Sequence, residues 1–268
     1  MQHLDLLRRV AGGELSPEDA AALLRAADVA ELGGIARLDV GRAARLGIPE
    51  VVLAGPKHPA EVAAIAATIL DRIGRCLVSR LRARHRRALQ ALAEDSGATL
   101  LMYGSRAALL LEPGVELPAP GRGLVGLIAA GTSDLDALAE ARMVLDATGV
   151  ASRTVADVGV AGLHRLFTPL AALVRDGADA IVVAAGMDGA LASVVTGLAG
   201  VPVIGLPTST GYGVGGRGRA ALLAMLQGCA PGLVVVNVDN GVGAGAAAAL
   251  VAMRHALPSR VTAAAGSV

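Results

Sequence analysis

Apolar runs and helix-like segments alternate along the second half of the chain. Each run is nearly unbroken and is followed by a segment of helical character; the runs are residues 123–131, 150–158, 179–186, 202–207 and 233–239. A strand that is buried on both faces reads as a continuous apolar run, and strands that alternate with helices form a parallel sheet. The pattern therefore predicts an α/β domain in which helices cover both faces of a parallel sheet.

The first half of the chain shows the same alternation on a smaller scale. In "SPEDAAALLRAADV", Ser16 suits the N-cap of a helix, Pro17 suits its first position, and acidic residues fill the first turn. Beyond this helix the pattern predicts three strands and two more helices: strand 49–55, helix 59–74, strand 76–79, helix 82–97 and strand 98–105. We therefore expect a smaller N-terminal α/β domain.

The two halves are separated by "LEPGVELPAPGRG", residues 111–123, which holds three prolines and three glycines. Clusters of Pro and Gly interrupt regular structure and mark linkers. We expect an N-terminal domain over residues 1–115, a catalytic domain over 121–256 and a C-terminal tail over 257–268.

Composition argues against several classes of function. Of the 268 residues 54% are hydrophobic, yet no apolar run reaches the roughly 18 residues of a membrane helix. We expect the excess apolar surface to lie between subunits of a homo-oligomer, without membrane contact. A net charge of +1 and 1% aromatic residues give no basis for nucleic-acid binding. The first residues lack the features of a secretory signal, so a cytoplasmic protein is expected.

The two cysteines, Cys76 and Cys229, lie far apart and have no CxxC spacing. Neither a zinc knuckle nor a disulfide framework is therefore indicated. Cys76 opens a predicted strand with no motif around it, and we interpret it as a buried filler. Taken alone, Cys229 has the same interpretation, because most free cysteines are small buried residues.

Two basic features of the N-terminal half each have two interpretations. Lys57 is the only lysine of an arginine-rich chain, and its compact charge suits a specific contact, although a solvated loop lysine is the simpler explanation. The run "SRLRARHRR", residues 79–87, could neutralise phosphate, but such a run on a short helix is more often a solvated face.

Ligands of a parallel α/β sheet sit outside the carboxyl ends of the strands, which directs attention to four junctions. The first, in "AAGTSDLDALAEA", places small and hydroxyl residues at a helix N-terminus, where an anion can bind; an ordinary helix cap explains it equally. The second, in "AAGMDGALASVVTGL", has glycines that permit a ligand to approach the backbone closely. The alternative is that its aspartate only caps the helix that follows. Their candidate binding residues are Gly131, Thr132, Ser133, Asp134, Gly186 and Met187, with Asp188 beside them.

The third junction, "GLPTSTGYGVGGRGRAALL", is too rich in glycine to be a mere connection, and it can close over a ligand. The fourth, "VVVNVDNGVGAG", ends a strand before a helix. Its GVGAG is not GxGxxG, and it closes the domain rather than opening it, so a Rossmann site is rejected. The candidate binding residues here are Thr208, Ser209, Tyr212, Gly213, Asp239 and Asn240.

Six motifs in one order carry a resemblance to a known family. "GTSDL", "DVGVAGLHRL", "AGMDGAL", "PTSTGYG", "LLAMLQGCAPG" and "VVNVDNG" resemble the LarB family, the carboxylase/hydrolase of nickel-pincer-nucleotide biosynthesis. The C-terminal domain of that family is similar to phosphoribosylaminoimidazole carboxylase. The resemblance covers about residues 120–250 strongly and extends weakly through "LDVGRAARLGIPEVV". It implies a flavodoxin-like catalytic domain and an octamer.

The resemblance also implies a reaction, the first step in making the nickel-pincer cofactor of lactate racemase. Nicotinic acid adenine dinucleotide is carboxylated at C5 of its pyridinium ring, with carbon dioxide from bicarbonate as co-substrate. Its phosphoanhydride is hydrolysed, which gives pyridinium-3,5-biscarboxylic acid mononucleotide and AMP. No tightly bound cofactor is expected; Thr132 and Ser133 would hold one phosphate, and Arg or Mg²⁺ the other.

A pyridinium carbon is electron-poor, which explains the need for a thiol. Grouped with the five other motifs at one sheet edge, Cys229 is the proposed nucleophile. Addition of its thiolate at C4 makes C5 an enamine carbon that attacks carbon dioxide, after which C5 loses its proton and the thiolate leaves. The family usually has glutamate where this chain has Asp188, to which an acid/base role is assigned; Asp157 and His164 are the alternatives. The carboxyl end of a helix disfavours a thiolate, so we expect the bound cationic ring to stabilise it.

Two other functions remain open. An aminoimidazole ribonucleotide carboxylase or mutase would use an electron-rich ring and would need no thiol, but its histidine-bearing loop is absent at a matching place. A non-catalytic nucleotide-binding module would use the glycine-rich junctions only to hold a ligand.

Overall fold

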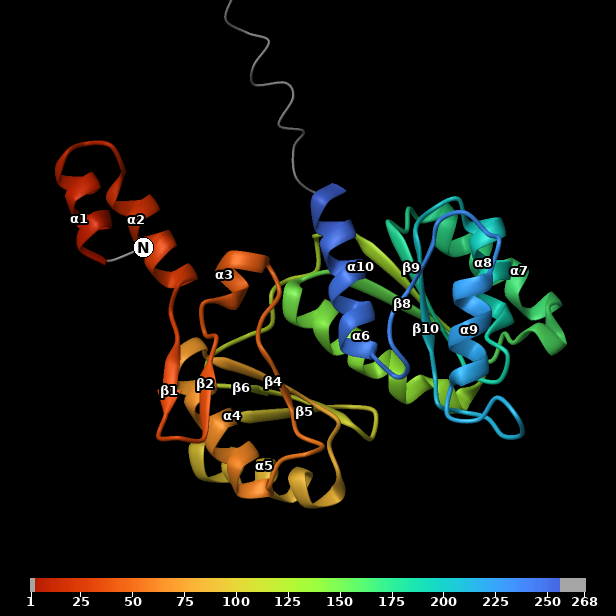
Figure 1. The fold of residues 1–268 in the computed structure, drawn as a ribbon, viewed down its shortest axis with the longest axis horizontal. Helices are drawn as coiled ribbons and strands as arrows, with labels where there is room; N and C mark the ends of the chain where they lie inside the picture. Colours follow the sequence, from red (N-terminus) through yellow and green to blue (C-terminus); the bar gives the residue numbers. More distant parts are fainter. Residues whose placement is uncertain (1–2, 256–268) are drawn as a thin grey trace, which may run out of the picture. The chain divides into compact units, whose positions relative to one another are not determined.

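The computed structural model describes residues 3–255, so the expected tail at 257–268 lies outside the described residues. The chain forms two compact units (Figure 1). Of the described residues, those up to Met102 and Ala108–Glu116 form the first unit, and Tyr103–Ala107 and those from Leu117 onward form the second.

The first unit packs helices against a four-stranded mixed sheet and carries a small antiparallel pair of strands. Its helices are α1 (His3–Ala11), α2 (Pro17–Ala26), α3 (Arg42–Leu46), α4 (Pro59–Ile73) and α5 (Ala83–Ser96). Its strands are β1 (Ala30–Leu32), β2 (Ala36–Leu38), β3 (Val51–Leu53), β4 (Arg75–Ser79), β5 (Thr99–Tyr103) and β6 (Ala107–Leu111). The sheet order is β3-β4-β6-β5, with β3 parallel to β4 and β6 antiparallel to β4.

The helices and strands predicted for this unit are confirmed, but α1, the β1–β2 pair, α3 and β6 were not predicted. The five residues of β6 are all buried, and a short continuous apolar run such as "AALLL" cannot be told from a piece of core helix by its pattern alone. Because β6 lies between β4 and β5, the sheet is mixed rather than a simple succession of parallel strands.

Local sequence explains how the helices of this unit begin and which face they bury. The Ser16 hydroxyl accepts the Asp19 N–H at 3.0 Å, as a helix cap does. In α4 the buried positions recur every three to four residues, which gives one apolar stripe against the sheet; they are Val62, Ile65, Ala66, Ile69 and Leu70. Cys76 is confirmed as a buried residue of this core, where burial raises the pKa of its thiol far above the ordinary value.

The second unit is a five-stranded sheet in which every strand is parallel to its neighbours. The strands are β7 (Leu124–Ala129), β8 (Ala151–Val155), β9 (Ala180–Ala185), β10 (Val203–Pro207) and β11 (Leu233–Val235), in the order β11-β10-β9-β7-β8. These five strands are the five predicted from the apolar runs. The flavodoxin-like α/β class is thereby confirmed.

Helices cover both faces of this sheet (Figure 1). On one face lie α6 (Leu135–Thr148) and α10 (Gly241–His255); on the other lie α7 (His164–Arg175), α8 (Ala190–Ala199) and α9 (Arg219–Gln227). All residues of β9 are buried, which explains its unbroken apolar sequence. No helix within residues 3–255 is long and apolar enough to span a membrane.

Two of the three glycines of GVGAG serve the packing of α10 on α6. A Cβ on Gly241 would lie 2.1 Å from the Ala137 carbonyl oxygen, and a Cβ on Gly245 would lie 2.6 Å from that of Ala141. Only glycine permits two helix backbones to approach this closely. The motif is therefore a helix contact, which agrees with the rejection of a dinucleotide fingerprint.

Candidate functional site

A pocket of about 280 Å³ lies at the carboxyl edge of the second unit's sheet. After β7 the chain passes to β8 on one side, and after β8 it returns to β9 on the other side of β7. This reversal opens a crevice between the loops, where ligands of such sheets bind. The lining comes from the loops that follow four strands: residues 130, 131, 133 and 134, residues 159–161, residues 185–188, 190 and 191, and Thr210.

Three of the residues predicted at the first junction line this pocket: Gly131, Ser133 and Asp134. Thr132 opens the 3₁₀ turn η1 (Thr132–Asp134) that leads into α6. Asp134 is only 3% exposed, and both of its carboxylate oxygens are occupied. One accepts the Gly131 N–H at 3.0 Å, and the other accepts the Thr208 hydroxyl at 2.6 Å. Asp134 therefore ties the β7 loop to the β10 loop and acts as a positioning residue.

Gly186, Met187 and Asp188 form a second wall of the pocket. A Cβ on Gly186 would lie 2.1 Å from the Thr210 carbonyl oxygen, so only glycine fits there. Met187 has a φ of +50°, a strained value for a non-glycine residue, and its N–H donates to the same carbonyl at 3.0 Å. The β9 loop is thus held against the β10 loop in one arrangement.

Asp188 is the exposed carboxylate of the pocket wall. One oxygen accepts the Ala190 N–H at 3.3 Å, so a weak cap of α8 is present. In the part of the chain that the structure describes, the Asp188 side chain makes this one hydrogen bond, so its other carboxylate oxygen remains open to a ligand. The capping and the functional interpretation of Asp188 are compatible with each other.

The third and fourth junctions hold each other in place beside the pocket. Asp239 accepts the Ser209 N–H at 2.7 Å and has a φ of +55°, and Asn240 accepts the Gly243 N–H at 2.9 Å at the start of α10. Thr208 is buried, whereas Tyr212 is 82% exposed in the glycine-rich loop that contains Gly213. None of these predicted residues lines the pocket.

Thr210 is the residue of this loop that the sequence reasoning missed. It lines the pocket, and its hydroxyl lies 3.4 Å from the Ser133 carbonyl oxygen, which it faces across the two loops. Its place in "PTSTGYG" was a signal, since the loop was expected to close over a ligand. The apolar lining residues 159–161 and Leu191 carry no such signal.

Asp157 and His164 flank the β8 loop but do not line the pocket. Asp157 has a φ of +60° and accepts the Arg165 guanidinium at 2.6 Å. His164 is an exposed residue at the start of α7. The structure therefore brings the loop into the site and leaves its two titratable side chains outside the lining.

Cys229 lies elsewhere than the prediction placed it. It is exposed, so the interpretation of Cys229 as a small buried residue is wrong. It follows α9 directly after Gly228, as expected of a residue at the end of that helix. However, it precedes β11, so it lies on the amino-terminal side of this strand, whereas the pocket lies beyond the carboxyl ends. The expectation that Cys229 shares one sheet edge with the other motifs is wrong within a single chain. A loop that leads into a strand cannot join loops that leave the parallel strands beside it.

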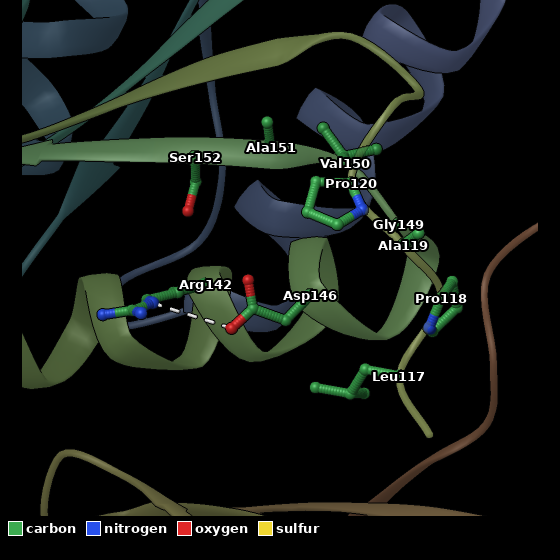
Figure 2. A pocket seen from close by; sticks show the side chains of 10 residues that line it. All are labelled: Leu117, Pro118, Ala119, Pro120, Arg142, Asp146, Gly149, Val150, Ala151 and Ser152. Atoms are coloured by element: carbon green, nitrogen blue, oxygen red, sulfur yellow. Dashed lines mark ion pairs between the residues drawn. The ribbon is translucent and has the colours of Figure 1, made fainter. Parts of the chain in front are cut away.

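A larger pocket of about 380 Å³ lies near the amino end of β8 (Figure 2). Arg142 and Asp146 of α6 point toward one another at its rim, with an Nε to Oδ2 distance of 3.6 Å. Linker residues Pro118 and Pro120 form another part of its lining. Its charged groups are paired with each other, so this pocket offers less to a reacting ligand than the pocket at the sheet's carboxyl edge.

The charges near the carboxyl-edge pocket limit what it can hold by itself. Asp134 and Asp188 are its acidic lining residues, and its lining contains no arginine or lysine. No cluster of three His, Cys, Asp or Glu side chains suited to a metal occurs in the part of the chain that the structure describes. A phosphate bound here can use backbone N–H groups near Ser133, but its charge requires a cation from outside this lining.

Comparisons with known proteins agree with this division into two parts. Residues 29–111 match the LarB/PurE-like N-terminal domain, and residues 124–264 match AIR carboxylase. An uncharacterized protein of Methanocaldococcus jannaschii is 34% identical over 248 residues, which is 92% of this chain and 96% of that protein. The two matched domains indicate a carboxylase-type function.

Proposed function

Because the chain belongs to the LarB family, with an AIR-carboxylase-like C-terminal domain, we propose that it carboxylates nicotinic acid adenine dinucleotide at C5 of the pyridinium ring. The phosphoanhydride is hydrolysed in the same site, which gives pyridinium-3,5-biscarboxylic acid mononucleotide and AMP. The observation that carries the proposal is the pocket at the β7/β9 reversal, with an exposed carboxylate on its wall.

The size of the pocket suits one part of this substrate. At about 280 Å³ it is just smaller than typical ligand sites, which span roughly 300–1,000 Å³. The pyridinium ring and its ribose would fit between the apolar residues of the β8 loop and the Gly186–Met187 wall. The adenylate half would lie outside, toward the exposed glycine-rich loop with Tyr212.

The Cys229 thiolate would begin the reaction by adding to C4 of the ring. The ring nitrogen then gains a lone pair, and C5, as an enamine carbon, attacks carbon dioxide and forms the new C–C bond. A base removes the C5 proton, and the C4–S bond breaks as the ring regains aromaticity. The thiol is regenerated, so no oxidant or reductant is consumed.

Cys229 lies outside the pocket of its own chain, so the proposal places it in the pocket of a second copy. Its surroundings suit such an interface, because α8, α9 and β11 present large apolar side chains to solvent. The exposed fractions are 51% for Leu198, 61% for Leu223, 62% for Leu226 and 56% for Val234. We therefore infer a homo-oligomer in which the loop between α9 and β11 completes a neighbouring site; the family resemblance suggests an octamer.

Asp188 is the best placed residue to accept the C5 proton. Both oxygens of Asp134 are occupied within the loops, and Asp157 is engaged by Arg165. Asp188 lines the pocket, and one of its oxygens accepts only the weak hydrogen bond from Ala190. Its carboxylate can remove the C5 proton if the ring binds with C5 about 3 Å away. Its side chain is one methylene shorter than glutamate, so the ring must bind close to the β9 loop.

Hydrolysis of the phosphoanhydride requires charge neutralisation at two phosphates. The N-terminal turn at Thr132 and Ser133 can hold one of them through backbone N–H groups. The second requires an arginine from outside the lining, or Mg²⁺ held mainly by the substrate's own phosphates and water. The described carboxylates offer no cage that would retain a metal without substrate.

Substitution of the thiol separates this proposal from an aminoimidazole ribonucleotide carboxylase. Cys229→Ser should abolish carboxylation of the pyridinium dinucleotide, because a serine hydroxyl is not acidic enough to add to the ring. Cys76→Ala is the control and should keep activity, since Cys76 lies in the core of the first unit. Carboxylation of aminoimidazole ribonucleotide by both wild type and Cys229→Ser would instead favour the alternative, because an electron-rich ring needs no thiol.

A further inference from the structure

Two loops meet at one edge of the first unit's sheet. Strands β3 and β4 are parallel and in register from Val51↔Leu77 to Leu53↔Ser79, so residues 54–58 and 80–82 leave the sheet at the same edge. The Ala54 N–H donates to the Ser79 carbonyl at 2.9 Å, which joins the two segments where they begin. This is the edge at which α/β sheets bind ligands.

Cations are concentrated on these two loops and on the first turn of α5. We call Lys57, Arg80, Arg82 and Arg84 the basic loop pair. Lys57 and Arg80 are half-buried, and Arg82 and Arg84 are exposed. Lys57 is also the only lysine of the chain. Both α4 and α5 begin at this edge, and their N-termini add positive potential to that of the side chains.

His85 holds the basic loop pair together. It is fully buried, its Nδ1 accepts the Arg82 N–H at 3.1 Å, and its Nε2 lies 3.1 Å from the Lys57 carbonyl oxygen. Because Nδ1 accepts a backbone proton, the neutral ring carries its own proton on Nε2 and donates it to Lys57. A buried side chain thus fixes the backbone of one loop to the start of the other.

The same tautomer leaves the Arg84 guanidinium available to a ligand. Its Nε lies 3.4 Å from His85 Nε2, but that nitrogen is already a donor and cannot accept a hydrogen bond from Arg84. Within residues 3–255 no carboxylate forms an ion pair with Lys57, Arg82 or Arg84; Glu61, on the first turn of α4, accepts the His58 N–H at 2.9 Å. The charges of Lys57, Arg82 and Arg84 are therefore placed by a buried residue and are not neutralised by a carboxylate of the described residues.

We propose that the basic loop pair binds a phosphoryl group. A lysine supplies a compact charge and arginine a planar fork of donors, which is the combination that recognises tetrahedral phosphate oxygens. The ligand is inorganic phosphate, diphosphate or the phosphate of a nucleotide. The site belongs to the first unit and does not rest on the reaction proposed for the second.

Hydrogen exchange of the full-length protein, followed by mass spectrometry, locates such a site. Inorganic diphosphate and AMP are the probes. Either probe should slow exchange in the segments 54–60 and 80–86, because a bound phosphate orders both loops. Equal protection by the two assigns the site to the phosphoryl group itself, and stronger protection by AMP assigns it to a nucleotide. The segments 130–134 and 186–191 report on the second unit's pocket separately.

Lys57→Gln/Arg84→Gln should weaken diphosphate binding by about tenfold or more in calorimetry and should remove the protection. The matched control, Arg25→Gln/Arg72→Gln, removes two exposed arginines from the last turns of α2 and α4 and should bind as wild type does. If the double variant does not fold, the same measurements are made on the single variant Lys57→Gln. The proposal would be overturned if neither probe protected these segments in the wild type, or if the protection persisted unchanged in the Lys57 and Arg84 variants.

Discussion

At the scale of single residues, the two aspartates of the pocket have opposite environments. Asp134 is buried with both oxygens hydrogen-bonded, whereas Asp188 is exposed with one weak bond. Their motifs made both of them candidate site residues. A sequence shows which residues follow a strand, but it does not show which of their side-chain atoms already have hydrogen-bond partners within the fold. The burial of Asp134 depends on Thr208, 74 residues further along the chain, and no local pattern reports that contact.

Asp134→Asn tests the positioning role of that carboxylate. Its amide NH₂ would face either the Gly131 N–H, which is also a donor, or the Thr208 hydroxyl, which would have to turn its own proton away. Either way a buried hydrogen bond is lost or redirected, which should lower the free energy of unfolding by about 1–3 kcal/mol. Asp188→Asn should change it by less than about 0.5 kcal/mol, because that side chain is exposed. Denaturant unfolding of both variants measures the difference, and equal stabilities would contradict the assignment.

Cys229 should become more reactive when a pyridinium ring binds. It lies at the carboxyl end of α9, where the helix dipole disfavours a thiolate, and a cationic ring beside the sulfur offsets this. The rate of alkylation by iodoacetamide should therefore rise on adding a non-reactive pyridinium mononucleotide that leaves the thiol accessible. Cys76 does not interfere, since burial keeps its thiol protonated. An unchanged or slower rate would count against the idea.

At the scale of elements, the sequence predicts the strands of the second unit correctly, but it predicts only in part which loops form the pocket. Continuous apolar runs identify buried strands, and the parallel arrangement follows from the helices between them. The position of Cys229 did not follow, because its motif was grouped with loops that leave strands although it enters one. In the first unit β6 was missed, since a fully buried five-residue run resembles a piece of core helix.

The contact between α6 and α10 depends on glycine at fixed positions. Gly245→Ala would place a Cβ 2.6 Å from the Ala141 carbonyl oxygen and should lower stability by about 1–3 kcal/mol as the helices separate. Gly197→Ala is the matched control in α8, because a Cβ there meets no atom within 4 Å. It should raise stability by about 0.5–1 kcal/mol through helix propensity alone. Thermal unfolding compares the two, and a neutral Gly245→Ala would refute the close contact.

At the scale of the whole molecule, the account requires that one copy supplies the thiol and another the pocket. Neither Cys229→Ser nor Asp188→Asn should be active alone, because each lacks one part of every site. Oligomers assembled from equal amounts of the two variants should regain about a quarter of wild-type activity if each site pairs two chains at random. Each variant refolded alone is the control. Mixtures that stay inactive, although mass spectrometry shows mixed oligomers, would place the thiol and the pocket in one chain.

The most direct test of the proposed reaction follows the carbon that it adds. The wild-type protein is incubated with nicotinic acid adenine dinucleotide, ¹³C-bicarbonate and Mg²⁺, and the products are identified by mass spectrometry. The account predicts AMP and, in equal amount, a pyridinium mononucleotide heavier by one labelled carboxylate. Intact dinucleotide, or AMP released without a labelled product, would contradict it.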